Sequence, residues 1–218
     1  MEHLLPFPIE RLLQIGMGFF WTITYILIIF KGLQDRTVGM PFASLCANLT
    51  WEAMFSFIFP LEPLQFTINM IWLTLDCIIL LQFIIYFRSM FPSIRYKYAF
   101  LLGSLATAFL INLGITIEFH DMVGKYSAFG MNFMMSLLFI LLALRQGTRG
   151  QSVYIGYTKW IGTFCSSILF YSLYPQSLLL FILSALTFIL DVIYIIVLKH
   201  QSAKRFAFSA TNMRRATR

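Results

Sequence analysis

The chain has 218 residues, of which 59% are hydrophobic and 11% are charged, and its mean hydropathy is +0.79. Soluble domains are nearer half apolar and a quarter charged, so the composition excludes an ordinary soluble globular protein. The formal net charge of +7 does not indicate a nucleic-acid partner, because most basic residues fall in short segments between apolar blocks and in the C-terminal tail.

The apolar residues form seven blocks of about 20 residues each, the length that crosses a bilayer as a helix. Runs such as SLLFILLAL do not alternate apolar and polar residues, as the strands of a membrane barrel would. We therefore predict an all-α polytopic membrane protein, a bundle of seven transmembrane helices in a single domain over residues 1–200, with a basic tail over 201–218. The predicted spans are 11–30, 41–59, 66–87, 98–117, 127–145, 153–173 and 177–198.

Basic residues are distributed unevenly among the predicted loops. They follow the first, third, fifth and seventh spans, whereas the other loops hold few or none. Because basic loops are retained in the cytoplasm, we expect the N-terminus outside or in a lumen and the C-terminus in the cytoplasm. The tail is expected to attract anionic lipid headgroups rather than to form a specific binding site.

Four acidic residues, Glu52, Asp76, Asp191 and Glu118, lie inside predicted spans or at their edges. Ionising a carboxyl group in a membrane is costly, and acids at such depth usually face the bundle interior at a functional site. The sequence predicts no lysine or arginine deep enough to neutralise them. The alternative is a structural role, in which each acid ties helices together through hydrogen bonds.

Helical spacing places polar and aromatic side chains on the same helix faces as three of these acids. The shared faces hold Asn48, Glu52, Phe55 and Phe59 in the second span, Trp72 and Asp76 in the third, and Thr187, Asp191 and Tyr194 in the seventh. We expect the three faces to converge on one cavity.

A carboxyl group in such a cavity can keep its proton at neutral pH and donate it. Among aromatic rings it could protonate an alkene or an epoxide, because the ring faces stabilise the resulting carbocation. The histidines lie in loops or at helix ends, and the sequence has no P-loop, no GxGxxG and no pair of aspartate-rich motifs for magnesium. We therefore expect no metal and no cofactor, and initiation by protonation rather than by ionisation of a diphosphate.

Several short motifs occur in an order that is similar to that of a known family. They are Asn48-x-x-Trp51-Glu52-x-x-Phe55 followed by Pro60, Thr148-Arg149-Gly150-x-Ser152, Tyr174-Pro175 with Asp191 beyond it, and the Gly16, Trp21, Tyr25 spacing. Over residues 10–195 the chain resembles the membrane-bound terpene cyclases of fungal indole-diterpene and meroterpenoid pathways, of the paxilline and pyripyropene type, and their bacterial relatives. It departs from them at Phe55, where many members would have tyrosine.

The resemblance implies a metal-independent enzyme that cyclises a prenylated aromatic, polyketide-derived or indole substrate, often after epoxidation of a terminal alkene. It implies that Glu52 and Asp191 are the essential acids; Asp76 and Glu118 are additional candidate acids or bases. The candidate substrate-binding residues are Trp21, Asn48, Trp51, Phe55, Trp72 and Tyr194. The expected partners are the hydrophobic substrate and the bilayer, of the endoplasmic reticulum in a fungus or the plasma membrane in a bacterium; a monomer is compatible with the sequence.

A second function stays open from the residues alone. A seven-span layout with an outside N-terminus would also suit a proton-coupled carrier or a receptor-like protein that binds small molecules. The seventh predicted span has no internal lysine for a retinal Schiff base, since Lys199 follows its end, and the chain has neither an Asp-Arg-Tyr nor an Asn-Pro-x-x-Tyr signature. These absences disfavour a rhodopsin or a receptor, and the resemblance favours the cyclase over the carrier.

Overall fold

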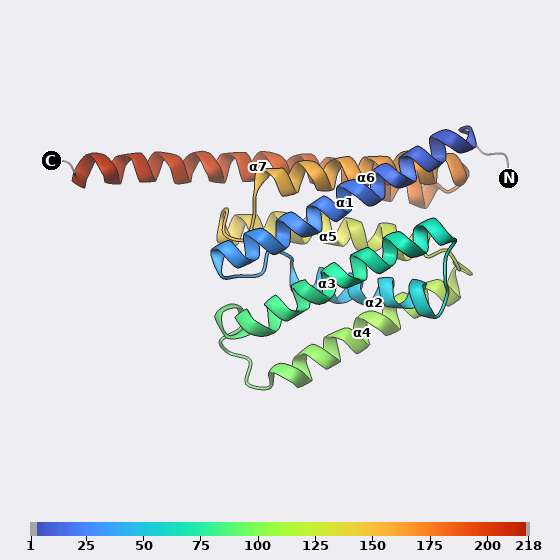
Figure 1. Cartoon of the computed structure of the whole chain (residues 1–218), viewed down its shortest axis with the longest axis horizontal. Coiled ribbons are helices and arrows are strands. Elements are labelled where there is room, and N and C mark those ends of the chain that lie inside the picture. The colour runs from blue at the N-terminus through green and yellow to red at the C-terminus, as the bar shows by residue number, and fades with distance from the viewer. Residues whose placement is uncertain (1–3, 217–218) are drawn as a thin grey trace.

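The computed structural model describes residues 4–216, with side chains described except at 89–90 and 205–216. Its described part contains seven helices and no strand, which confirms the predicted all-α fold (Figure 1). The helices are α1 (Phe7–Asp35), α2 (Phe42–Phe57), α3 (Pro63–Met90), α4 (Lys97–Glu118), α5 (Lys125–Gln146), α6 (Val153–Leu173) and α7 (Leu178–Ala216).

Five of these helices, α1, α3, α4, α5 and α7, are long and apolar enough to cross a membrane. With 16 residues, α2 is about 24 Å long and falls short of a hydrocarbon core of about 30 Å. Helix α6 has 21 residues, but glycine, serine, threonine and Lys159 interrupt its apolar residues. Seven helices were therefore predicted correctly, whereas two of them lack the length or the composition of a membrane span.

The C-terminal helix extends further than the sequence predicted. Helix α7 continues to Ala216 and runs well past the ends of the other helices, so the basic tail predicted over 201–218 continues the last helix as far as it is described (Figure 1). The orientation of the termini relative to the membrane stays a prediction.

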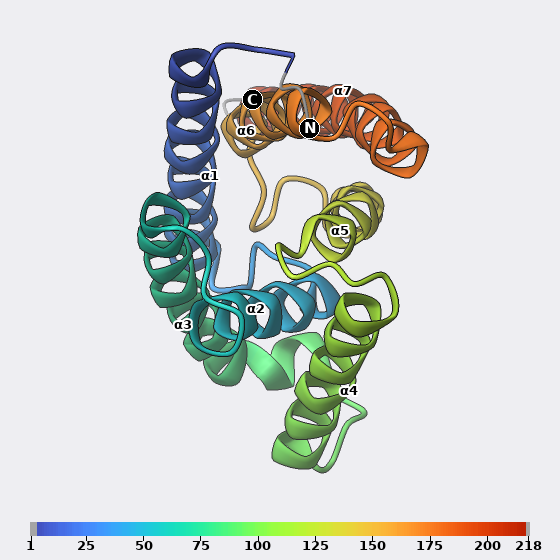
Figure 2. The ribbon, with the colours of Figure 1, turned by 90° about the vertical axis from the view of Figure 1, so that its right-hand side faces the viewer.

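Six helices form a closed ring of neighbours, which Figure 2 shows from one end of the bundle. In order around the ring, α1 packs on α6, α6 on α7, α7 on α5, α5 on α2, α2 on α3, and α3 on α1. Helix α4 lies outside the ring, against α2 and α5. The ring leaves an interior that side chains from several helices can line.

Proline and capping residues set the start of several helices. Pro6 and Pro41 precede α1 and α2 in extended conformation, where a missing N–H costs nothing. Glu62 caps α3 by accepting hydrogen bonds from the backbone N–H groups of its first turn, and Ser152 caps α6 by accepting from the N–H of Ile155. Glu62 therefore has a fixed position at the start of α3.

The loop between α5 and α6 is tied to the loop between α1 and α2. The N–H of Gly150 donates to Asp35 Oδ2 at 2.7 Å, and the side-chain amide of Gln151 donates to the carbonyl of Gly39. Gly150 has φ +71°, and a Cβ there would lie 2.8 Å from Thr37 Cγ2. The Thr148–Ser152 motif is thus a junction between two loops at one end of the bundle.

Many phenylalanines pack against one another rather than around the ring interior. The ring centroid of Phe42 lies 4.3 Å from that of Phe83 and 5.0 Å from that of Phe100, in stacked arrangements. This cluster joins α2, α3 and α4, where it supplies packing energy.

Candidate active site

A cavity of about 430 Å³ lies inside the ring, between α1, α2, α3, α5 and α6. Its volume is within the range of small-molecule sites, about 300–1,000 Å³. Its aromatic lining consists of Phe7, Trp21, Tyr25, Trp51, Trp72, Phe129, Phe170 and Tyr174. A wall of this kind suits an apolar ligand of substantial size.

The mouth of the cavity lies between the N-terminal ends of α1 and α3. Phe7 there is 65% exposed, and Arg11 forms an ion pair with Glu62 at 2.9 Å between Nη1 and Oε1. Gln14 Nε2 donates to the same oxygen at 2.7 Å. Partial burial raises the pKa of Glu62, but the hydrogen bonds from Arg11 and Gln14 outweigh it, so the pKa lies below its ordinary value. The mouth is therefore polar and charged.

Glu52 lies on the cavity wall in the interior of the protein and is fully buried. The Tyr25 hydroxyl donates to Glu52 Oε1 at 3.0 Å, and Asn48 Nδ2 donates to the same oxygen at 2.9 Å. Asn48 Nδ2 also contacts the Tyr25 hydroxyl oxygen. The other carboxyl oxygen, Oε2, has no hydrogen-bond partner in the described structure. One oxygen of Glu52 is thus fixed by two donors, while the other is left for a ligand.

Asp76 joins this cluster from α3. Asn48 Nδ2 donates to Asp76 Oδ2 at 2.9 Å, so one amide links the carboxyl groups of Asp76 and Glu52. Both acids are fully buried, and neither forms an ion pair within the described residues. Two carboxylates without a cation would be costly at this depth, so the arrangement suits a pair that shares a proton. Asp76 does not line the cavity and reaches it only through Asn48.

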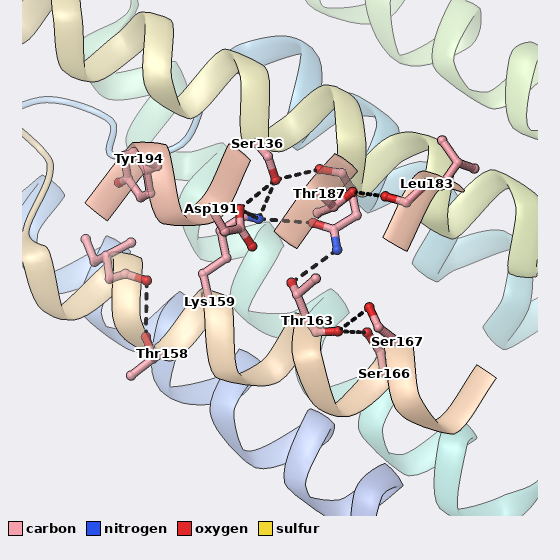
Figure 3. A network of polar contacts seen from close by, with 12 residues as sticks. Ser136, Thr158, Lys159, Thr163, Ser166, Ser167, Leu183, Thr187, Asp191 and Tyr194 are labelled. Atoms are coloured by element: carbon pink, nitrogen blue, oxygen red, sulfur yellow. Dashed lines mark hydrogen bonds and ion pairs between the residues drawn. The ribbon is translucent and has the colours of Figure 1, made fainter. Parts of the chain in front are cut away.

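Asp191 belongs to a different network, which it forms with Lys159 and Ser136 (Figure 3). Lys159 Nζ lies 2.6 Å from Asp191 Oδ1, and Ser136 Oγ donates to the same oxygen at 2.7 Å. Asp191 is not part of the cavity lining. The expectation that all three acids converge on one cavity is therefore wrong, because only Glu52 lines it; Asp76 contacts the wall residue Asn48, and Asp191 does not belong to this cluster.

The expectation that no basic residue reaches the buried acids is also wrong. Lys159 is fully buried and pairs with Asp191. The sequence contained a signal for this pair, because Lys159 lies about two helical turns inside a predicted span rather than at its end. A charge at that depth needs a partner of opposite sign, and the seventh span supplies Asp191.

Four predicted substrate-binding residues lie on the cavity wall. They are Trp21, Asn48, Trp51 and Trp72. Two of the indole rings are fixed by hydrogen bonds, since Trp51 Nε1 donates to Ser127 Oγ at 3.0 Å and Trp72 Nε1 donates to Thr22 Oγ1 at 3.2 Å. Their ring planes are therefore held in place without a ligand.

Three other predicted site residues lie away from the cavity. Phe55 packs against Trp51 and the backbone of Gly124, and Tyr194 donates its hydroxyl to Gln151 in the loop junction. Glu118 is exposed at the end of α4. Phe55 shares a face of α2 with Asn48 and Glu52, whereas α4 and α7 contribute no residue to the cavity lining.

Tyr25 was not among the predicted site residues, although its hydroxyl donates to Glu52 and contacts Asn48. Its position four residues after Trp21 places both side chains on one face of α1. That spacing could have identified it.

The model of the family of Pyr4-like transmembrane terpene cyclases matches residues 6–204. The chain belongs to this family. The resemblance that the sequence motifs indicated is thereby confirmed.

The Pyr4-like chain is similar to several fungal terpene cyclases. It is 30% identical to the Pyr4-family terpene cyclase mfmH of Annulohypoxylon moriforme over 181 residues, 76% of this chain and 72% of that protein. It is 26% identical to the terpene cyclase macJ of Penicillium terrestre over 71% of this chain and 63% of that protein. A shorter match, 40% identical over 57 residues, covers 26% of this chain and 24% of the terpene cyclase ptmB of Penicillium ochrochloron. The chain thus spans less than two thirds of macJ and ptmB, and no solved structure matches it significantly.

Proposed function

We propose that this membrane protein is a terpene cyclase in which Glu52 protonates an epoxide or a terminal alkene of a prenylated aromatic, polyketide-derived or indole substrate. The observation that supports it most directly is the buried Glu52 carboxyl on an aromatic cavity wall, with one oxygen held by two donors and the other unpartnered. Family membership supports the reaction class.

The hydrogen bonds to Glu52 favour proton donation. When Oε2 gives its proton to the substrate, negative charge develops on the carboxyl group. Tyr25 and Asn48 already donate to Oε1, and hydrogen bonds to a charged acceptor are stronger than those to a neutral one. The donors therefore stabilise the transition state more than the ground state.

The aromatic wall suits the cation that protonation creates. Trp21, Tyr25 and Trp72 follow one another along the wall, with ring centroids 6.1 Å and 6.3 Å apart. The faces of aromatic rings attract positive charge, so they stabilise a carbocation without trapping it as a nucleophile would. Closure of the rings then needs a chain folded against this wall, and the final cation loses a proton to the ionised Glu52 carboxylate to give an isomer of the substrate.

The polarity of the cavity suggests how the substrate lies in it. Arg11, Gln14 and Glu62 supply polar groups at the mouth, whereas Glu52 lies at the buried end. We infer that the polar head group of the substrate occupies the mouth and that its prenyl chain extends inwards to Glu52. The terminal alkene or epoxide is then the group that meets the acid.

Asp76 has a supporting role in this account. It contacts the Asn48 amide and not the cavity, so it cannot donate directly to the substrate. We infer that the two carboxyl groups, both bound by the Asn48 amide, hold one proton between them before the reaction, and that Glu52 regains its proton when the final cation loses one.

The experiment is to express the chain in a host supplied with a prenylated indole or polyketide, with and without a terminal epoxide. Cyclisation conserves mass, so the expected product is an isomer of the substrate that wild-type cells form and Glu52→Gln cells do not. Recovery of unchanged substrate from membranes that contain folded protein would contradict the proposal for the compounds tested. Proton-coupled uptake without an isomer would favour the carrier instead.

A further inference from the structure

We propose that Lys159 and Asp191 act together as a neutral ion pair that positions the cavity wall, and that Asp191 exchanges no proton with the substrate. The part of this inference that concerns catalysis rests on the proposed cyclase function. The geometry behind it is independent of the substrate.

The pair is deeply buried and connects three helices. Lys159 on α6 and Asp191 on α7 are both fully buried, with 2.6 Å between Nζ and Oδ1 (Figure 3). Ser136 on α5 donates to the same Asp191 oxygen at 2.7 Å and lies 2.7 Å from Lys159 Nζ. The Lys159 ammonium therefore lies directly beside the Asp191 carboxylate, where it compensates the charge. This environment differs from that of Glu52, which has no cation beside it within the described residues.

Two residues connect the pair to the cavity. Lys159 Nζ donates to Asn132 Oδ1 at 3.2 Å, and the amide nitrogen of Asn132 donates to Thr163 at 3.2 Å, so both ends of this amide are fixed. Lys159 Nζ also lies 5.4 Å from the ring centroid of Trp21. Asn132 and Trp21 both line the cavity, whereas Lys159 and Asp191 do not. The pair therefore acts on the substrate only through these two wall residues.

The contacts with Trp21 leave it little room to move. A Cβ at Gly162 would come within 2.7 Å of Trp21 Cδ1, so α6 packs closely against the indole. The ammonium of Lys159 lies on the same ring. Displacement of Lys159 would therefore alter the position of a ring that we expect the carbocation to contact.

The charges of the pair must be present together or absent together. A lone Lys159 ammonium behind Trp21 would repel a carbocation on the other side of the wall. A lone Asp191 carboxylate would be a buried, uncompensated charge. Removing one member of a buried ion pair destabilises a protein more than replacing both members with uncharged side chains. We therefore expect each single variant to lose folded protein and activity to a similar extent, and the double variant to regain both.

The experiment compares Lys159→Met, Asp191→Asn and the double variant Lys159→Met/Asp191→Asn with the wild type. The first measurement is the yield of folded, monodisperse protein in detergent, which needs no substrate. We expect both single variants to yield several-fold less than the wild type and the double variant to approach it. A double variant that yields no more than the single variants would overturn the ion-pair assignment, whether or not the protein is a cyclase.

The second measurement is the rate of product formation per folded protein and the ratio of the isomers formed. We expect a loss of about 100-fold in each single variant and recovery to within about tenfold of the wild type in the double variant, in which residue 191 can no longer donate a proton. We also expect the isomer ratio of the double variant to shift, because Asn132 and Trp21 lose their contacts with Lys159.

Two results would contradict the inference here. A folded double variant as inactive as Asp191→Asn would make Asp191 a reacting group. A fully active double variant with the wild-type isomer ratio would show that Lys159 and Asp191 do not position the cavity wall. If the proposed function itself is wrong, the wild type forms no product. The yields of folded protein still test the ion pair in that case, so the two failures can be distinguished.

Discussion

Glu52 and Asp76 are joined through a single amide, because Asn48 Nδ2 lies 2.9 Å from Glu52 Oε1 and 2.9 Å from Asp76 Oδ2. The two acids come from α2 and α3, and only Glu52 reaches the cavity. This arrangement gives the two carboxyl groups different roles, since one contacts the ligand and the other contacts only its support. Each residue around the amide therefore has a separate, measurable effect.

Tyr25→Phe removes the hydroxyl that donates to Glu52 and keeps the aromatic ring on the cavity wall. A hydrogen bond to a charged group contributes about 1.5–3 kcal/mol, so we expect the turnover rate to fall about 10- to 100-fold. KM should change little, because the wall keeps its shape. The measurement is the rate of product formation per folded protein.

Tyr194→Phe is the matched control. Tyr194 is equally buried, but its hydroxyl donates to Gln151 in the loop junction, away from the cavity. We expect this variant to lose stability while its turnover rate per folded protein stays within about twofold of the wild type, because no cavity contact changes. Equal rates for the two tyrosine variants would show that the Tyr25 hydroxyl does not assist Glu52.

Asn48→Leu removes the amide that joins the two acids and leaves a side chain of similar size. Glu52 loses one of its two donors, and Asp76 loses the hydrogen bond to its Oδ2. We expect a loss of about 1–3 kcal/mol in the free energy of unfolding and at least about 100-fold in turnover.

Asn112→Leu controls for the loss of a buried amide. Asn112 Nδ2 donates to the carbonyl of Ala47 and to Thr50 Oγ1, and it links α4 to α2 outside the cavity. We expect a comparable loss of stability, measured by thermal unfolding, with turnover per folded protein retained. Similar turnover losses in both variants would assign the effect of Asn48 to packing alone.

Gly124→Ala should disturb the cavity wall from the loop before α5. Gly124 has φ +69°, and a Cβ there would lie 2.4 Å from Phe55 Cζ. Its carbonyl also accepts from Trp51 Nε1 at 3.3 Å. Backbone strain alone costs about 1–3 kcal/mol, and the clash adds to it, so we expect a clear fall in melting temperature and an altered product ratio.

Gly114→Ala is the control for this glycine. A Cβ at Gly114 on α4 meets no atom within 4 Å, and alanine favours a helix by about 1 kcal/mol over glycine. The melting temperature should therefore stay constant or rise slightly. A Gly124→Ala variant as stable as Gly114→Ala would contradict the described contact with Phe55.

The ion pair of Glu62 at the cavity mouth should make the stability of the fold depend on pH. Because the pKa of Glu62 is lower in the folded protein than its ordinary value, its ion pair with Arg11 stabilises the fold above that ordinary value, about 4.3. The stabilisation is lost as the pH falls through the lower, folded-state pKa. The pair is partly exposed, so the effect should be small and weaken with salt.

The measurement compares the melting temperatures of the wild type and Glu62→Gln at neutral pH and below about pH 4. We expect the difference between them to shrink at the lower pH. In the activity assay, Glu62→Gln should change KM more than turnover, since the head group is proposed to lie at this mouth. A pH-independent difference in melting temperature would contradict the role of the carboxylate.

The sequence was sufficient to predict the helices and the acid on the cavity wall. Blocks of apolar residues indicate where the membrane helices lie. A carboxyl group such as that of Glu52 in one of these blocks is too costly to face lipid, so it is expected to face the protein interior. Spacing along α2 also placed Asn48 on the face of Glu52, where the structure has it. These are local properties that each helix carries by itself.

The contacts between helices were not predictable in the same way. Asp76 and Asp191 have similar sequence surroundings, but one bonds to Asn48 and the other to Lys159, which depends on how α3 and α7 are rotated in the bundle. Phe55 shares a face with Glu52, yet the loop carrying Gly124 covers it. Rotation and loop placement arise from packing of the whole ring, so periodicity in one segment does not determine them.

The most direct test of the central claim is the rate of cyclised product formation, per folded protein, by Glu52→Gln. Glutamine keeps the size of the side chain and can accept the bonds from Tyr25 and Asn48, but it cannot donate the carboxyl proton. Glu118→Gln, at an exposed acid outside the cavity, is the control and should behave like the wild type. We predict a loss of at least about 1,000-fold for Glu52→Gln with normal folding. A rate within about tenfold of the wild type would show that Glu52 is not the proton donor.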